Sequence, residues 1–271
     1  MELFRVENLS FAYERSDLKA IDSSKNLVLE NINLRFFSSD FLALTGANGG
    51  GKSTLIKLIL GLLSPQNPHI TRYIDTTQMG YVPQITQANP HFAIRAIDCV
   101  AMGLVGGKSF GFAHKLDKDK ARNALSLVGI ENLWDRNLND LSGGQRQRVF
   151  IARALVGECK ILLLDEPSAS VDKQSAEAIF ALLDCLHKNG VGILLISHDV
   201  DLASKYANKV ATLNHTLEWL SNGLQNPPQN GLPSAQNAQN LCENQNPTHA
   251  KSTLQRIQNP QNQQHLRKAN A

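Results

Sequence analysis

Nine consecutive residues have the composition of a phosphate-binding loop and fit the pattern G-x-x-x-x-G-K-[ST]. The glycines let successive backbone N–H groups turn inward around an anion, and a helix that begins in the loop adds the partial positive charge of its N-terminus. We expect Lys52 to reach the β- and γ-phosphates of a nucleotide, Ser53 to ligate Mg²⁺ and Thr54 to bond near the α-phosphate. The complete loop is Gly46, Ala47, Asn48, Gly49, Gly50, Gly51, Lys52, Ser53 and Thr54.

Two acidic residues follow the apolar run Ile161-Leu162-Leu163-Leu164. The run predicts a buried strand whose carboxyl end places Asp165 beside the phosphate loop, where Asp165 can hold Mg²⁺ through water. Glu166, one residue further on, would point in another direction and could polarise an attacking water as general base. The two motifs together predict a nucleotide hydrolysis site with ATP and Mg²⁺ as cofactors.

A third anion-binding element is the segment Leu141-Ser142-Gly143-Gly144-Gln145, which opens a helical stretch to Leu155. With LSGGQ between the phosphate loop and the acidic strand, residues 1 to about 223 resemble the ATP-binding subunits of ABC transporters. The resemblance implies that Ser142, Gly143, Gly144 and Gln145 bind the γ-phosphate of an ATP held by an opposite subunit. It therefore implies a head-to-tail homodimer, in which each site is incomplete without the second copy.

Further roles come from the resemblance alone. Gln84 matches the glutamine that touches Mg²⁺ and relays the nucleotide state to the membrane subunit. His198 matches the histidine that contacts the γ-phosphate, and Ser170-Val171-Asp172 matches a loop that crosses the dimer interface. Tyr13 matches the aromatic residue that stacks on adenine, with Phe11 as the competing candidate.

The elements that must position these residues alternate between strands and helices. Apolar strands at residues 41–45, 161–164 and 193–196, with helices over 53–63 and 173–186, predict a largely parallel sheet covered on both faces. Short strands are expected in residues 1–45. The fold class is therefore α/β, and the resemblance implies a P-loop NTPase core of the ABC ATPase type with an antiparallel β subdomain and a helical subdomain at about 86–155.

Composition divides the 271-residue chain into two parts. Residues 1–223 are expected to form the ATP-binding domain, with a polar loop at 14–26. Residues 224–271 belong to a terminal stretch rich in Asn and Gln, which cannot bury enough apolar surface to order itself and should be disordered. Loose metal binding by His249 and His265 is the alternative for this tail.

Charge and hydropathy exclude several classes of function. The net charge is only +3, and the last 51 residues hold four basic residues and one acid, which leaves residues 1–220 with equal numbers of each sign. No basic field therefore favours nucleic acid. No apolar run is long enough to cross a bilayer, and the N-terminus has no secretory pattern. The four cysteines are widely spaced and predict reduced thiols and no metal site.

The resemblance also implies partners and a location. We expect integral membrane permease subunits, an extracellular or periplasmic substrate-binding protein acting indirectly, and a peripheral position on the cytoplasmic face of the inner or plasma membrane. Residues 80–84, 96–103, 165–172 and 210–215 resemble the zinc and manganese importers, so metal import is the favoured transport function. An importer of iron chelates or related cofactors, an exporter, and an ATPase unconnected with transport remain the alternatives.

Overall fold

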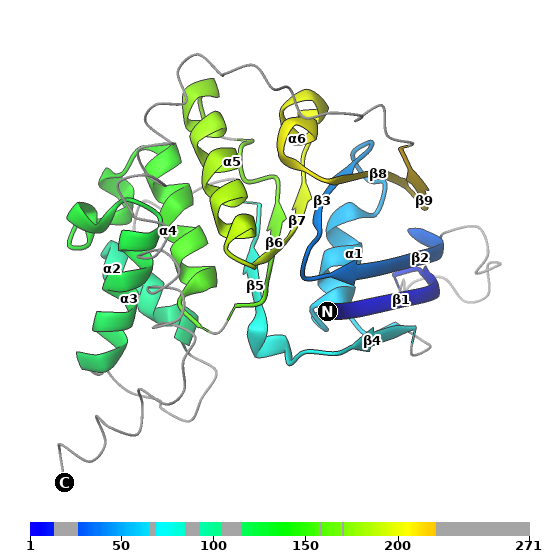
Figure 1. Ribbon diagram of the computed structural model, residues 1–271, viewed down its shortest axis with the longest axis horizontal. Helices are drawn as coiled ribbons and strands as arrows, with labels where there is room; N and C mark the ends of the chain where they lie inside the picture. The colour runs from blue at the N-terminus through cyan, green and yellow to red at the C-terminus, as the bar shows by residue number, and fades with distance from the viewer. Residues whose placement is uncertain are drawn as a thin grey trace, which may run out of the picture.

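The computed structural model describes residues 1–13, 27–65, 69–84, 93–104, 115–157, 159–169 and 171–220 (Figure 1). The predicted loop at 14–26 and the predicted disordered tail at 224–271, with His249 and His265, lie outside these residues. Ser170 of the predicted interface loop also lies outside them. The division at residue 223 therefore stays a prediction.

A six-stranded sheet forms the centre of the protein in the order β5-β6-β7-β3-β8-β9. Its first five strands run parallel and β9 is antiparallel to β8. In chain order the strands are β3 (Phe41–Thr45), β5 (Met79–Val82), β6 (Ile161–Asp165), β7 (Gly192–Ile196), β8 (Lys209–Asn214) and β9 (Thr216–Trp219). The predicted α/β class with a mainly parallel sheet is confirmed.

The apolar runs of β3, β6 and β7 are buried on both faces of this sheet. Phe41 and Ala43 belong to one hydrophobic cluster, whereas Leu42 and Leu44, which point the opposite way, belong to the other. Ile161 to Leu164 divide between the two clusters in the same alternating manner. Side chains alternate in direction along a strand, so a continuous apolar run fits a strand covered on both sides.

A second, antiparallel sheet has the order β2-β1-β4. It consists of β1 (Glu2–Phe11), β2 (Leu29–Phe37) and β4 (Ile70–Arg72). Its inward residues share one cluster with α1 (Lys52–Ile59), as with Phe4 and Ile56. In Figure 1 this sheet lies on the opposite side of the central sheet from the other helices. The expected antiparallel β subdomain is present.

The other helices pack on the far face of the central sheet. Three of them lie together in Figure 1: α2 (Ala96–Ala101), α3 (Lys115–Leu127) and α4 (Gly143–Leu155). Helices α5 (Lys173–Lys188) and α6 (Val200–Tyr206) follow β6 and β7. Short 3-10 turns occur at Thr76–Gln78, Met102–Leu104, Glu131–Leu133 and Leu138–Asp140. Among the described residues, no helix has the length and apolarity that a membrane crossing requires.

Two sequence predictions are corrected by the structure. The helix expected over 53–63 ends at Ile59, because Gly61 takes φ 75° and the Leu62 N–H bonds to the Lys57 carbonyl at 2.8 Å. Such a left-handed glycine with a returning bond is a common helix stop. Cys99 and Cys159 are buried free thiols as expected, but Cys185 is disulfide-bonded, so the prediction of four reduced thiols is wrong.

Candidate functional site

Four of the predicted site elements meet at one edge of the central sheet. Strands β5, β6, β7 and β3 are neighbours that run parallel, so their carboxyl ends lie side by side. Gln84 follows β5, Asp165 ends β6, and His198 follows β7. The phosphate loop, residues 46–54, follows β3. Ligands of open α/β sheets bind at this edge, so the topology brings the separate motifs to the expected place.

The phosphate loop is held open by glycines in conformations that other residues rarely adopt. Gly46 has φ 128° and Gly51, which precedes α1, has φ 92°. A Cβ atom on Gly51 would lie 2.6 Å from a methyl carbon of Leu29. Both the backbone conformation and the neighbouring strand therefore require glycine here.

Lys52 lies inside this loop. Its Nζ donates to the carbonyl of Gly46 at 2.9 Å and to that of Ala47 at 2.8 Å. Burial lowers the pKa of Lys52, and the charges of Glu166 and Asp165 oppose that shift. The loop backbone thus surrounds the Lys52 ammonium group at the N-terminus of α1. A positive charge at a helix N-terminus is suited to binding an anion.

Asp165 is buried at the end of β6, with only 4% of its surface exposed. Burial raises the pKa of its carboxyl group, and a hydrogen bond from the Ser53 hydroxyl works against this. Its Oδ1 atom is buried without a hydrogen-bond partner. An unpaired carboxylate oxygen beside a hydroxyl is a donor set that suits Mg²⁺, since that cation prefers oxygen ligands.

Glu166 turns away from Asp165 and bridges two neighbouring strand ends. Its φ of 50° is unusual for a residue with a side chain and directs the carboxylate toward Gln84 and His198. Gln84 Nε2 donates to Glu166 Oε2 at 2.6 Å, and His198 Nε2 lies 2.6 Å from Glu166 Oε1. The three predicted residues are therefore in direct contact, which the sequence alone did not predict.

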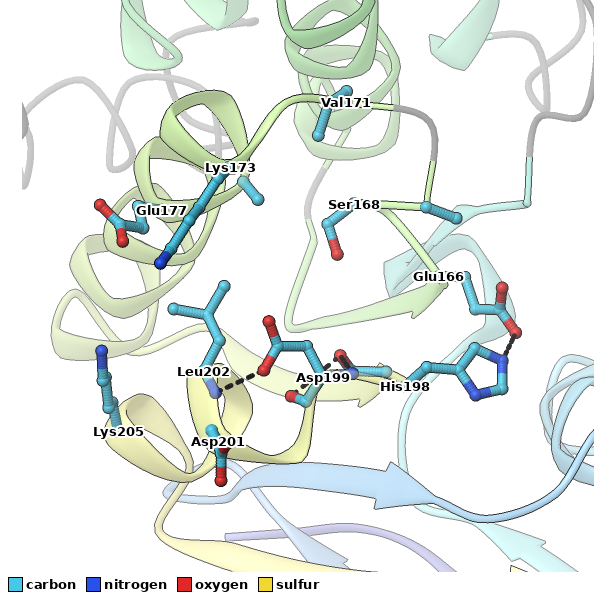
Figure 2. A pocket seen from close by; sticks show the side chains of 13 residues that line it. Glu166, Ser168, Val171, Lys173, Glu177, His198, Asp199, Asp201, Leu202 and Lys205 are labelled. Carbon is cyan, nitrogen blue, oxygen red and sulfur yellow. Dashed lines mark hydrogen bonds and ion pairs between the residues drawn. The ribbon is translucent and has the colours of Figure 1, made fainter.

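Glu166 and His198 also line a pocket of about 510 Å³. Figure 2 shows these two residues at one end of the view and residues of α5 and α6, including Lys173 and Lys205, at the other. Its remaining walls include Ser168 and Val171 from the loop after β6. The pocket is lined by two stretches of the chain, residues 166–177 and 197–205, whose proximity no local sequence pattern predicts.

Tyr13 lies next to the phosphate loop, whereas Phe11 is buried. The Tyr13 hydroxyl is 3.1 Å from Thr54 Oγ1, and 48% of the residue is exposed. Phe11 is only 8% exposed and meets the Tyr13 ring edge to face at 5.1 Å. An exposed ring is available for stacking on a base, which favours Tyr13 over Phe11.

The segment Ser142 to Gln145 closes on itself at the start of α4. The Ser142 side chain accepts from the Gln145 N–H at 3.3 Å, and the Gln145 side chain accepts from the Ser142 N–H at 3.0 Å. This capping box leaves Ser142 and Gly143 exposed, whereas Gly144 packs against Ser175 of α5. The segment is thus an exposed, preorganised helix start.

Gly144→Ala is expected to lower the free energy of unfolding by about 1–3 kcal/mol, the usual effect of overpacking. The new Cβ would lie 2.8 Å from Ser175 Oγ and 2.9 Å from Ser175 Cβ. Urea denaturation of the two single variants and of the double variant Gly144→Ala/Ser175→Gly measures the coupling. The double variant should recover most of the loss relative to Ser175→Gly. An additive result would contradict this packing.

Comparison with known proteins agrees with this geometry. Residues 29–169, more than half of the chain, match the sequence model of the family described as ABC transporter. The zinc uptake system ATP-binding protein ZurA of Listeria monocytogenes is 36% identical over 223 residues, which cover 79% of this chain and 83% of ZurA. The manganese transport system ATP-binding protein MntB of Bacillus subtilis is 37% identical over 217 residues, which cover 77% of this chain and 82% of MntB.

Solved structures show the same fold. A protein described as an inward-facing, metal-chelate type ABC transporter has a TM-score of 0.71 at 32% identity, covering 82% of this chain and 84% of that one. An ATP-binding cassette solved as a dimer with ADP and Pi has a TM-score of 0.65 at 25% identity, covering 81% of this chain and all of that one.

Proposed function

The chain belongs to the ABC transporter family as an ATP-hydrolysing, ATP-binding subunit, and from this premise we propose that it powers the import of zinc or manganese through a membrane permease. The observation that carries the catalytic part of the proposal is the position of Glu166. Its carboxylate is held by Gln84 and His198 at the sheet edge that also carries the phosphate loop.

In this proposal Glu166 is the general base. Its carboxylate takes a proton from a water molecule as the water oxygen bonds to the γ-phosphorus, and the bond from that phosphorus to the β–γ bridging oxygen breaks to release ADP. Lys52 and the backbone N–H groups of the loop stabilise the charge on the phosphates. His198 adds a hydrogen-bond donor to the γ-phosphate and orients Glu166, while Tyr13 holds the adenine.

Mg²⁺ fits this arrangement because Asp165 has an unpaired buried oxygen beside the Ser53 hydroxyl. We assign Ser53, Asp165 and Gln84 as the residues that hold it. When bound, the cation supplies positive charge to the phosphate oxygens. Gln84 follows β5, the strand next to β6, and would offer its side-chain amide oxygen.

We further propose that two copies pair head to tail, so that Ser142 to Gln145 of one copy complete the ATP site of the other. The exposed start of α4 supports this pairing, because Ser142 and Gly143 lie on the surface at a helix N-terminus, where an anion can bind. The solved dimer of a similar cassette supports it as well. The pair would bind permease subunits at the cytoplasmic face of the membrane and act with a substrate-binding protein outside.

Zinc and manganese are favoured as cargo by the relatives. ZurA and MntB, described as zinc and manganese transport proteins, both align with more than three quarters of this chain. A metal chelate is the second candidate, because the structural match at TM-score 0.71 is described as a metal-chelate type transporter. The ATPase does not touch the cargo, so the choice needs an experiment in cells.

The elemental content of cells under metal limitation tests the cargo. Cells that carry only the Glu166→Gln variant should contain less zinc or manganese than wild-type cells, because an inactive ATPase cannot drive uptake. The control is a strain with Asp201→Asn, since the Asp201 carboxylate lines the same pocket and has no part in the proposed chemistry. Loss of iron alone would favour the chelate alternative, and unchanged metals throughout would contradict metal import.

A further inference from the structure

The end of β8 and the turn between β8 and β9 pack against the phosphate loop. A Cβ atom on Gly46 would lie 2.2 Å from the carbonyl oxygen of Leu213, and one on Gly50 would lie 2.7 Å from the same atom. Leu213 and the next residue, Asn214, are the last residues of β8. Two loop glycines are therefore required by contact with a segment about 165 residues away in the sequence.

His215 is the residue at the apex of this turn, and its backbone joins two other segments. Its N–H donates to the Gly50 carbonyl at 3.1 Å, and its own carbonyl accepts from the Glu30 N–H at 2.8 Å. The first bond ends on the phosphate loop and the second on β2, so the backbone of one residue ties the loop to the N-terminal sheet. The β8–β9 hairpin lies beside β2 in Figure 1.

The side chain and conformation of His215 support the same connection. Its φ is 64°, a left-handed value that His and Asn adopt more readily than most residues and that β-branched residues resist. Its Nδ1 atom lies 3.1 Å from the carbonyl oxygen of Leu27, so this nitrogen must carry the proton and donate. The ring thereby holds the chain at Leu27, just before β2, and the His215 backbone holds the phosphate loop.

We propose that His215 is a positioning residue for the phosphate loop. The Gly50 carbonyl turns outward to the His215 N–H. Neighbouring N–H groups of the loop can then converge on an anion, which is how such loops bind phosphate. The His215 contact therefore sets the affinity for nucleotide and not the rate of hydrolysis once nucleotide is bound. The inference rests on the phosphate-binding role proposed for residues 46–54.

The test compares His215→Val, His215→Asn and Asn8→Val in the full chain. Valine at 215 disfavours the left-handed conformation and moves the N–H away from Gly50, so we expect the Kd for ATP and the KM to rise about tenfold with kcat unchanged. Asparagine tolerates the conformation and should bind ATP like the wild type. Asn8 has φ 49° on β1, away from the loop, and provides the matched control for strain.

Titration with a fluorescent ATP analogue, below the unfolding temperature of each variant, gives the affinities. Equal ATP affinity in His215→Val and wild type would overturn the inference, as would an equal loss in Asn8→Val. A fall in kcat with an unchanged KM would also overturn it. Failure of the wild-type chain to bind ATP would instead contradict the proposed function, so the two failures are distinguishable.

Discussion

Replacing Glu166 with glutamine is expected to leave ATP binding intact and to lower the rate of ATP hydrolysis about 10²–10⁴-fold, the usual contribution of a general base. The amide has nearly the shape of the carboxylate but cannot accept a proton from water. It keeps one oxygen that can accept a hydrogen bond from Gln84 or His198, so the local structure should persist. Steady-state phosphate release and nucleotide titration measure the two quantities separately.

Asp201→Asn is the matched control for this experiment. Asp201 lines the same pocket as Glu166 but lies on α6, and the same change of carboxylate to amide there should leave hydrolysis near the wild-type rate. Hydrolysis at the wild-type rate by Glu166→Gln would contradict the proposed base. A large loss in both variants would indicate a general effect of charge around the pocket.

Removing the Lys52 ammonium is expected to weaken ATP binding about 100-fold. Charge-assisted hydrogen bonds contribute about 1.5–3 kcal/mol each, and the side chain already lies inside the loop, bonded to the Gly46 and Ala47 carbonyls. In Lys52→Ala those carbonyls also lose their donor. Isothermal titration with ATP and Mg²⁺ gives the affinity directly.

Lys188→Ala controls for the loss of one positive charge. Lys188 lies at the end of α5 and forms an exposed ion pair with Asp184, a kind of contact with little effect on stability or binding. Its ATP affinity should equal that of the wild type. If Lys52→Ala binds ATP as tightly as Lys188→Ala, the assignment of the phosphate loop fails.

Local patterns were sufficient to predict the parts of the site that are continuous in sequence. The apolar runs of β3 and β6 lie at the predicted residues, and the loop and the acidic pair follow them directly. A short, continuous apolar run of this kind favours a buried strand, because a strand buried on both faces needs apolar residues at every position. Helix α1 ends earlier than predicted because the left-handed conformation of Gly61 stops it, although the apolar spacing continues beyond that residue.

Contacts between distant segments could not be predicted from local patterns. The bridge from Glu166 to Gln84 and His198 depends on the strand order β5-β6-β7, which no single segment specifies. The short strands β4 and β5 carry no clear alternation, and the sequence analysis did not identify them. The contact of His215 with Gly50 joins residues whose spacing gives no sign of their proximity.

The central claim is that ATP is hydrolysed at Glu166 in a site that a second copy completes, and the mass of the Glu166→Gln chain in solution tests it most directly. Analytical ultracentrifugation in Mg²⁺ with saturating ATP should show a dimer that retains two nucleotides, because bound ATP cannot be turned over. The same chain with ADP should be a monomer. A monomer that binds ATP without pairing would contradict the claim.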